Sequence, residues 1–217
     1  MADKRKKLIS IIVGVMVVAL ASVGSYYWYK NAYYVSTEDA RVAGDLVSVS
    51  PQISGKLLEL NIEEGDTVVK DQILGRQGMS GPQETNIDQS VFRAPIGGLI
   101  IKKQGTVGEY ISAGQTVAII IDPEKLYISA NIEETKLTKI REGQNVDITI
   151  DQYSDKPFTG KIMHVGQASN STFALLPSST SGTFTKVIQK VPVKIEFDKS
   201  DVTLLPGTNA VVKIHIK

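Results

Sequence analysis

An internal repeat between positions 47 and 122, at an offset of 43 residues, limits the folds that this sequence can adopt. Gly55-Lys56-Leu57-Leu58 corresponds to Gly98-Leu99-Ile100-Ile101, and Gly65-Asp66-Thr67-Val68 corresponds to Gly108-Glu109-Tyr110-Ile111. Short runs of Val and Ile, broken by Gly, Asp, Asn and Pro, predict strands and show no long helical period. We therefore expect two similar β-units that face each other.

Four glycines of the repeat, Gly55, Gly65, Gly98 and Gly108, are predicted to serve the backbone and not a ligand. Gly55 and Gly98 follow prolines, at places where only glycine tolerates a positive φ or a close backbone approach. The pairs Gly65-Asp66 and Gly108-Glu109 predict hairpin turns between short strands. The two units are expected to bury Val49, Ile53, Leu57, Leu60 and Val68 against Ile96, Ile100, Val107, Ile111 and Val117.

The second half of the chain predicts a small β-barrel. Apolar or alternating runs indicate strands at 126–132, 146–150, 158–165, 187–197 and 210–216, and one or two helical turns fit within 133–140. With residues 37–42 as a possible extra strand, this number of short strands suits a small closed barrel. The predicted fold class is mostly β.

The N-terminal segment predicts a membrane anchor. Leu8 to Tyr29 is a run of 22 residues without a charge, long enough as a helix to cross the hydrocarbon layer. Lys4, Arg5, Lys6 and Lys7 precede it, which predicts a cytoplasmic N-terminus, and Tyr and Trp gather at its far end. The alternative is a cleavable signal peptide ending near Ala19-Leu20-Ala21. Both interpretations place the body outside the cytoplasm.

Charge and composition exclude several classes of function. Residues 1–7 hold four of the 24 basic residues and one of the 23 acidic ones, so the remainder carries 20 bases against 22 acids. A slightly acidic body does not favour nucleic-acid binding. The chain has no cysteine, so disulfides and thiolate metal sites are excluded.

Residues that could carry chemistry are scattered. His164 and His215 stand alone, with no His or carboxylate at ligand spacing. The acids Glu63-Glu64 and Glu133-Glu134 are expected to be solvated. The serines at 178, 179 and 181 lack the context of a nucleophile elbow. We expect no enzyme activity, no metal and no cofactor.

The repeat resembles the two halves of a biotinyl/lipoyl-type domain, here 47–77 and 91–122. In carriers of that family, a lysine at the junction of the halves takes the cofactor. The junction in this chain, residues 78–90, has no lysine, and Lys70 lies within the first half. The resemblance therefore implies the fold without a covalent cofactor.

Several further stretches, taken in order, resemble the HlyD-type membrane fusion proteins, or periplasmic adaptors, and their EmrA-like multidrug-efflux branch. They are Ser36–Gly44, Val49–Gly55, Phe92–Gly98, Ala130–Thr135, Glu142–Val146, Phe173–Pro177, Gly182–Val187, Gln189–Val193 and Leu205–Thr208. The implied domains are a cytoplasmic tail (1–7), an anchor (8–29), a linker with the first barrel strand (30–46), a lipoyl-like domain (47–122) and a β-barrel (123–217). Relatives insert a long α-helical hairpin between the lipoyl halves, which the connector 78–90 is too short to hold.

The resemblance implies a membrane-anchored adaptor of an export or multidrug efflux system, single-pass in the cell membrane. Its implied partners are a second copy of itself and an integral-membrane transporter, of the major-facilitator type in preference to an ATP-driven one. An alternative function is an anchored structural or cell-wall-interaction module without a transport role. A lipoyl-type carrier component is a third class.

The loop 166–186 has an apolar centre within a polar sequence. We expect Phe173, Leu175, Leu176 and Phe184 to contact the transporter or the membrane surface. Capping of one end of the barrel is the alternative, and both remain open at this point.

Overall fold

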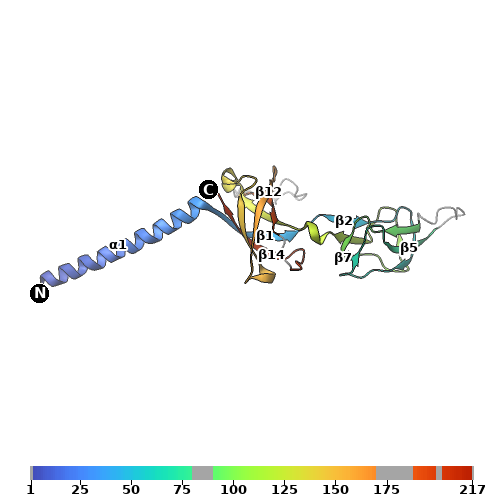
Figure 1. Cartoon of the computed structure of the whole chain (residues 1–217), viewed down its shortest axis with the longest axis horizontal. Helices are drawn as coiled ribbons and strands as arrows, with labels where there is room; N and C mark the ends of the chain where they lie inside the picture. Colours follow the sequence, from blue (N-terminus) through green and yellow to red (C-terminus); the bar gives the residue numbers. More distant parts are fainter. Residues whose placement is uncertain (1, 80–89, 170–187, 199–201, 217) are drawn as a thin grey trace, which may run out of the picture. The chain divides into compact units, whose positions relative to one another are not determined.

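The computed structural model describes residues 2–79, 90–169, 188–198 and 202–216, with 2–11 and 79 by their backbone only. The described chain forms two compact units. One consists of the described parts of 1–41, 128–200 and 208–217, and the other of those of 42–127 and 201–207. The first unit holds a long helix and a closed barrel, and the second holds two small sheets (Figure 1).

Helix α1 (Ala2–Tyr33) contains the apolar segment predicted from the sequence. Within it, Ile12–Tyr33 is long and apolar enough to cross a membrane, judged by length and composition. The large apolar side chains between Ile12 and Tyr29, such as Met16, Leu20 and Trp28, are all more than half exposed. Residues 30–33, predicted as part of a linker, instead continue the helix because this stretch contains neither Gly nor Pro, and β1 follows at once.

The barrel closes through six strands in the order β1-β10-β13-β12-β11-β14. Their bounds are β1 Tyr34–Ala43, β10 Tyr127–Glu133, β11 Asn145–Ile150, β12 Pro157–Val165, β13 Lys190–Phe197 and β14 Asn209–His215. The five predicted strands and the extra strand near 37–42 are confirmed. The predicted helical turn is the 3₁₀ helix η2 (Glu134–Lys139).

Alternation of buried and exposed residues along these strands builds the interior of the barrel. In β11 and β14, for example, every second residue is buried and those between face outward. The buried set comprises Val35, Ala40, Val42, Ile128, Ala130, Ile132, Val146, Ile148, Ile150, Phe158, Ile162, Val191, Val193, Ile195, Ala210, Val212 and Ile214. Burial of one face with a period of two is what selects the strand pairing, because a slip of one residue would expose the whole set.

The second unit consists of two four-stranded sheets. One has the order β2-β9-β7-β4, and the other has the order β6-β5-β3-β8. Their bounds are β2 Leu46–Val49, β3 Gly55–Leu60, β4 Thr67–Val68, β5 Ile73–Met79, β6 Val91–Arg93, β7 Gly98–Lys103, β8 Tyr110–Ile111 and β9 Ala118–Ile121.

The 43-residue offset maps one sheet onto the other. Adding 43 to the residue numbers of β3 and β4 gives the residue numbers of β7 and β8. The same addition places β2 within a few residues of β6, and β5 within a few residues of β9. Each sheet therefore contains two strands from each half of the repeat. The two similar halves predicted from the repeat are therefore present, but they exchange strands, so each of the two sheets draws on both halves.

The two predicted hairpin turns are also corrected. The turn at Gly65 links β3 and β4, which belong to different sheets, and the turn at Gly108 links β7 and β8 in the same way. Leu57 N donates to Glu109 O over 2.7 Å, and Ile100 N donates to Asp66 O over 2.9 Å. Each turn thus bonds to a strand of the other half, and the two strands that it links do not pair with each other.

Most of the predicted core of this unit is buried. Of the ten expected residues, Val49, Leu57, Leu60, Val68, Ile100, Ile111 and Val117 lie in the core and Ile96 packs against it. Ile53 is half-buried, and Val107 is 56% exposed. Val107 was misplaced because it occupies the turn before Gly108, where alternation along a strand does not apply.

Candidate functional site

Among the described residues, no group of three or more His, Cys, Asp or Glu side chains is placed to hold a metal ion. The two histidines were expected to stand alone, but in the structure each lies beside a carboxylate. Nδ1 of His164 lies 3.1 Å from Oε1 of Glu142, and Nε2 of His215 lies 2.7 Å from Oδ2 of Asp147. Pairing of β11 with β14 brings the second pair together from 68 residues apart, so sequence spacing carried no sign of it.

The predicted acidic groups have partners in the structure. Oε1 of Glu63 lies 2.7 Å from Nζ of Lys103, and Oε1 of Glu64 accepts from the Lys103 backbone N–H over 3.0 Å. Glu133 pairs with Lys136 at 3.0 Å. These contacts lie at or near the surface and stabilise the fold locally.

The turn glycines Gly65 and Gly108 share one geometry. Their φ angles are 96° and 95°, and the residue that follows each donates its N–H to a carbonyl three residues earlier. The side chains of these following residues close the turns from the other direction. Asp66 accepts the N–H of Glu63 over 2.7 Å, and Glu109 accepts the N–H of Thr106 over 3.1 Å. A positive φ at the third position of such a turn favours glycine, which explains the Gly-acid pairs.

Gly55 and Gly98 are held by close backbone contact. A Cβ at Gly55 would overlap the carbonyl oxygen of Gly78, and a Cβ at Gly98 would overlap that of Ile121. Gly78 and Ile121 are themselves 43 residues apart. The close approach is therefore a property of the repeat.

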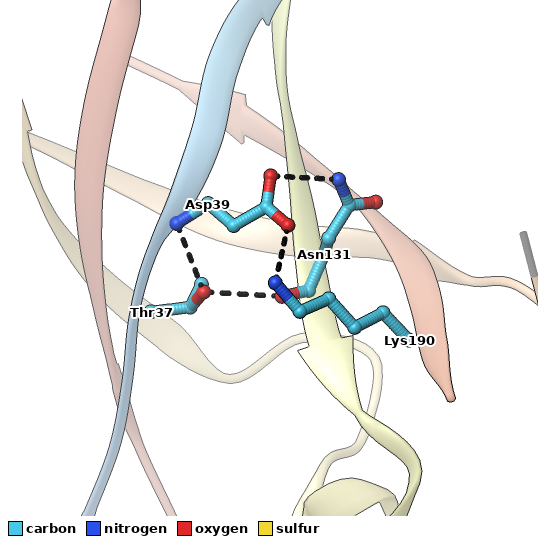
Figure 2. A network of polar contacts seen from close by, with 4 residues as sticks. All are labelled: Thr37, Asp39, Asn131 and Lys190. Carbon is cyan, nitrogen blue, oxygen red and sulfur yellow. Dashed lines mark hydrogen bonds and ion pairs between the residues drawn. The ribbon is translucent and has the colours of Figure 1, made fainter. Parts of the chain in front are cut away.

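A polar network joins β1 to β10 and β13 on the barrel (Figure 2). Asp39 is its centre: Oδ1 accepts from Nδ2 of Asn131 over 3.0 Å, and Oδ2 accepts from Nζ of Lys190 over 2.7 Å. Thr37 Oγ1 accepts the Asp39 N–H and donates to the Asn131 carbonyl, each over 3.1 Å. The network thus connects β1, the first strand of the barrel, with β10 and β13, which follow it by about 90 residues or more in sequence.

A bulge in β1 places Asp39 in this network. Thr37 lies opposite Val212 and Ala40 lies opposite Ala210, so β1 has one residue more than β14 in this interval. Glu38 and Asp39 are consequently both exposed between neighbours that face inward. The hydrogen bond from Lys190, followed by that from Asn131, holds the pKa of the Asp39 carboxyl below its usual value of 3.8. The carboxylate is thus ionised at neutral pH and acts as a structural acceptor.

A second cluster lies at the junction between α1 and the barrel. The Ile216 N–H donates to the Tyr33 carbonyl over 3.0 Å, and Nζ of Lys139 donates to the Asn31 carbonyl over 3.4 Å. Nζ of Lys213 lies 4.0 Å from the centre of the Tyr34 ring, whose edge-to-face partner is His215 at 5.0 Å. These contacts tie the last turn of the helix to β14 and η2.

The remaining predicted site residues, Phe173, Leu175, Leu176 and Phe184, lie outside the described residues, as do the serines at 178, 179 and 181. The basic and aromatic residues of the helix–barrel junction were not singled out from the sequence as a cluster. The sequence indicated only the aromatic residues between Tyr26 and Tyr34, because the lysines of this junction come from three separate parts of the chain.

Comparison with known families assigns both units. Residues 45–123 match the family described as the RND MFP, barrel-sandwich hybrid domain. Residues 126–214 match the YknX-like beta-barrel domain. The first match covers the paired four-stranded sheets, and the second covers β10 to β14 of the barrel.

Relatives match over very different shares of their own length. YhbJ of Bacillus subtilis (strain 168), named for a proposed role as an efflux system component, is 38% identical over 98% of this chain and 94% of its own length. Multidrug export protein EmrA of Haemophilus influenzae is 35% identical over 60% of this chain, but only 35% of its own length is covered. A solved structure of the periplasmic adaptor protein EmrA, 15% identical, superposes with a TM-score of 0.57 over 84% of this chain and 98% of that chain.

Proposed function

This chain belongs to the membrane fusion proteins, in an EmrA-like branch that lacks the long α-helical hairpin, and on that basis we propose that it is the membrane-anchored adaptor of an export system. One observation carries the proposal: this chain contains an apolar helix, a barrel-sandwich hybrid and a barrel, and it aligns over 98% of its length with a relative named as an efflux system component. The adaptor would act by binding a partner, without catalysis of its own.

The proposed partner is an integral-membrane transporter that supplies the energy for export. The resemblance to EmrA favours a major-facilitator transporter over an ATP-driven one, and amphipathic drugs or similar lipophiles as substrates. We also propose a homo-oligomer, with α1 crossing the cell membrane, its basic N-terminus in the cytoplasm and both β-units outside.

The short connector limits how far the assembly reaches. Only residues 80–90, eleven positions, separate β5 from β6. Even as one continuous helix they would span only about 16 Å, which is too little for two antiparallel helices. We propose that the assembly stops at the membrane that holds the transporter and does not meet a second channel.

In-membrane crosslinking of the tagged full-length protein, followed by mass spectrometry, tests the adaptor function. A polytopic transporter recovered in stoichiometric amount is the expected result, and an unrelated single-pass protein expressed at the same level serves as the control. Recovery of self-contacts or cell-wall material alone would sink the export role and favour the structural alternative that the missing hairpin suggests.

The apolar residues of the 166–186 loop belong to the same proposal as contacts of the transporter or the membrane surface. A variant with serine at Phe173, Leu175, Leu176 and Phe184 is expected to lose crosslinks while its barrel keeps the hydrogen-exchange protection of the wild type. If the crosslinks persist and the protection falls, these residues cap the barrel instead.

A further inference from the structure

A pocket of about 580 Å³ lies at the junction between α1 and the barrel. Tyr27, Trp28 and Asn31 of the helix line it, together with Tyr34 and Ser36 of β1. Four lysines complete the lining, from three separate parts of the chain: Lys30, Lys136, Lys139 and Lys213. The size falls within the range of pockets that hold small molecules.

The charged residues that line the pocket are all positive. The lining includes four lysines and no Asp or Glu. Among the described residues, Lys136 is the only one of the four in an ion pair, with Glu133 at 3.0 Å, and both side chains are more than a third exposed. The nearby Asp147, which lies opposite Lys213 in the β11–β14 register, is engaged by His215 at 2.7 Å. Three of the four lysines therefore have no ion pair among the described residues, and the net positive charge of the lining favours an anion.

The other contacts of the lysines keep their charge available. Lys139 donates to a neutral carbonyl, that of Asn31, and Lys213 lies over the ring of Tyr34. Neither contact neutralises an ammonium group. The hydrogen bond from Ile216 to Tyr33 holds the end of the helix beside β14, the strand that supplies Lys213.

The position of the pocket along the chain indicates the source of the anion. Its helical residues Tyr27, Trp28 and Lys30 lie near the end of the apolar segment Ile12–Tyr33. In an anchored protein this end of the helix is at the level of the lipid headgroups, where Trp and Tyr are enriched. Each lysine near a membrane surface that carries anionic lipids is attracted to it by about 1 kcal/mol.

From this arrangement we propose that the pocket binds the phosphate group of an anionic lipid at the outer surface of the membrane. The lysines would hold the phosphate, while Trp28 and Tyr27 lie against the boundary between headgroup and acyl chains. This inference rests on the proposed anchoring of the chain and adds a specific ligand to it. A bound lipid would fix the barrel at a set height above the membrane, beside the transporter.

The test is native mass spectrometry of the full-length protein in detergent, with phosphatidylglycerol and phosphatidylcholine of identical acyl chains. The wild type is expected to retain phosphatidylglycerol preferentially. A variant carrying Lys139→Gln and Lys213→Gln is expected to lose that preference by roughly tenfold or more. The matched control carries Lys156→Gln and Lys161→Gln, the same charge change on exposed barrel residues outside the pocket, and is expected to behave as the wild type.

Two further arms make the result decisive. Lys139→Arg with Lys213→Arg keeps the charge and is expected to restore the preference. Millimolar inorganic phosphate is expected to compete only weakly, because the acyl chains add to the affinity of a lipid. If phosphate alone binds while the wild type shows no preference between the two lipids, or if the control loses the preference as fully as the pocket variant, the lipid site is overturned.

The outcome also separates this inference from the adaptor function. The pocket variant is expected to stay in the membrane fraction and to crosslink to the transporter. A wild type that crosslinks to a transporter but shows no lipid preference contradicts the lipid site alone. A wild type absent from the membrane fraction contradicts the anchoring, and the lipid site with it.

Discussion

Nζ of Lys190 lies 2.7 Å from Oδ2 of Asp39, although 151 residues separate them in sequence. The pair belongs to the network that connects the first strand of the barrel with β10 and β13. Asp39 would otherwise be a half-exposed acid on a bulge. The pair therefore contributes to closing the barrel at the strand with the longest chain separation from its neighbours.

Removal of this ion pair is expected to weaken the barrel slightly. Asp39→Asn and Lys190→Met should each lower its free energy of unfolding by about 0.5–1 kcal/mol, and the double variant should lose less than the sum. The loss is modest because both side chains are 46% exposed. Hydrogen-exchange mass spectrometry on β1 and β10 of the full-length chain measures it. Additive effects would show that the two residues act independently.

The same carboxylate predicts a pH dependence. Its pKa is lower in the folded protein than the usual 3.8, so the folded state favours the ionised form. The stabilisation is complete above pH 3.8 and is lost as the pH falls through the lower, folded pKa. Between pH 5 and pH 2, roughly, the exchange protection of β1 should fall more in the wild type than in Asp39→Asn. Equal falls in the two proteins would assign the pH dependence to other carboxylates.

The glycines of the repeat are expected to differ in their sensitivity to alanine. Gly55→Ala places a Cβ against the Gly78 carbonyl oxygen and should destabilise the second unit by about 2 kcal/mol or more. Gly65→Ala meets no atom within 4 Å and should cost only the left-handed backbone conformation, about 1 kcal/mol. Exchange protection of β3 and β5 measures both effects. The reverse order of sensitivity would contradict the close backbone approach at Gly55.

Asp71 marks a place where the repeat departs from itself. Its φ is 65°, whereas the corresponding residue of the second half is Gly114 with φ of 80°. Both turns are otherwise alike, with Gln72 or Gln115 accepting the N–H three residues earlier over 2.9 and 3.1 Å. Asp71→Gly should raise the stability of the unit by about 0.5 kcal/mol, and Gly114→Asp should lower it by about as much. A loss on Asp71→Gly would show that the aspartate makes a contact that outweighs its backbone cost.

Local sequence pattern predicted the features of this protein that depend on neighbours along the chain. The apolar helix, five barrel strands, most of the core positions and the turn glycines all follow from local periodicity and from backbone angles that only glycine adopts readily. The repeat at 43 residues also predicted that the sheets would be alike. The strands, the core positions and the turn glycines were readable because each is set by residues close to it in the sequence.

Only the tertiary structure decided which segments became partners. The exchange of strands between the halves, the pairing of His215 with Asp147 and the contact of Asp39 with Lys190 depend on topology, which local patterns leave open. Val107 shows the same limit, since its apolar side chain fits a strand until the turn around it is known. The lysines at the helix–barrel junction come together because barrel closure brings β14 and η2 beside the end of α1. Their common surface therefore exists only in the folded chain.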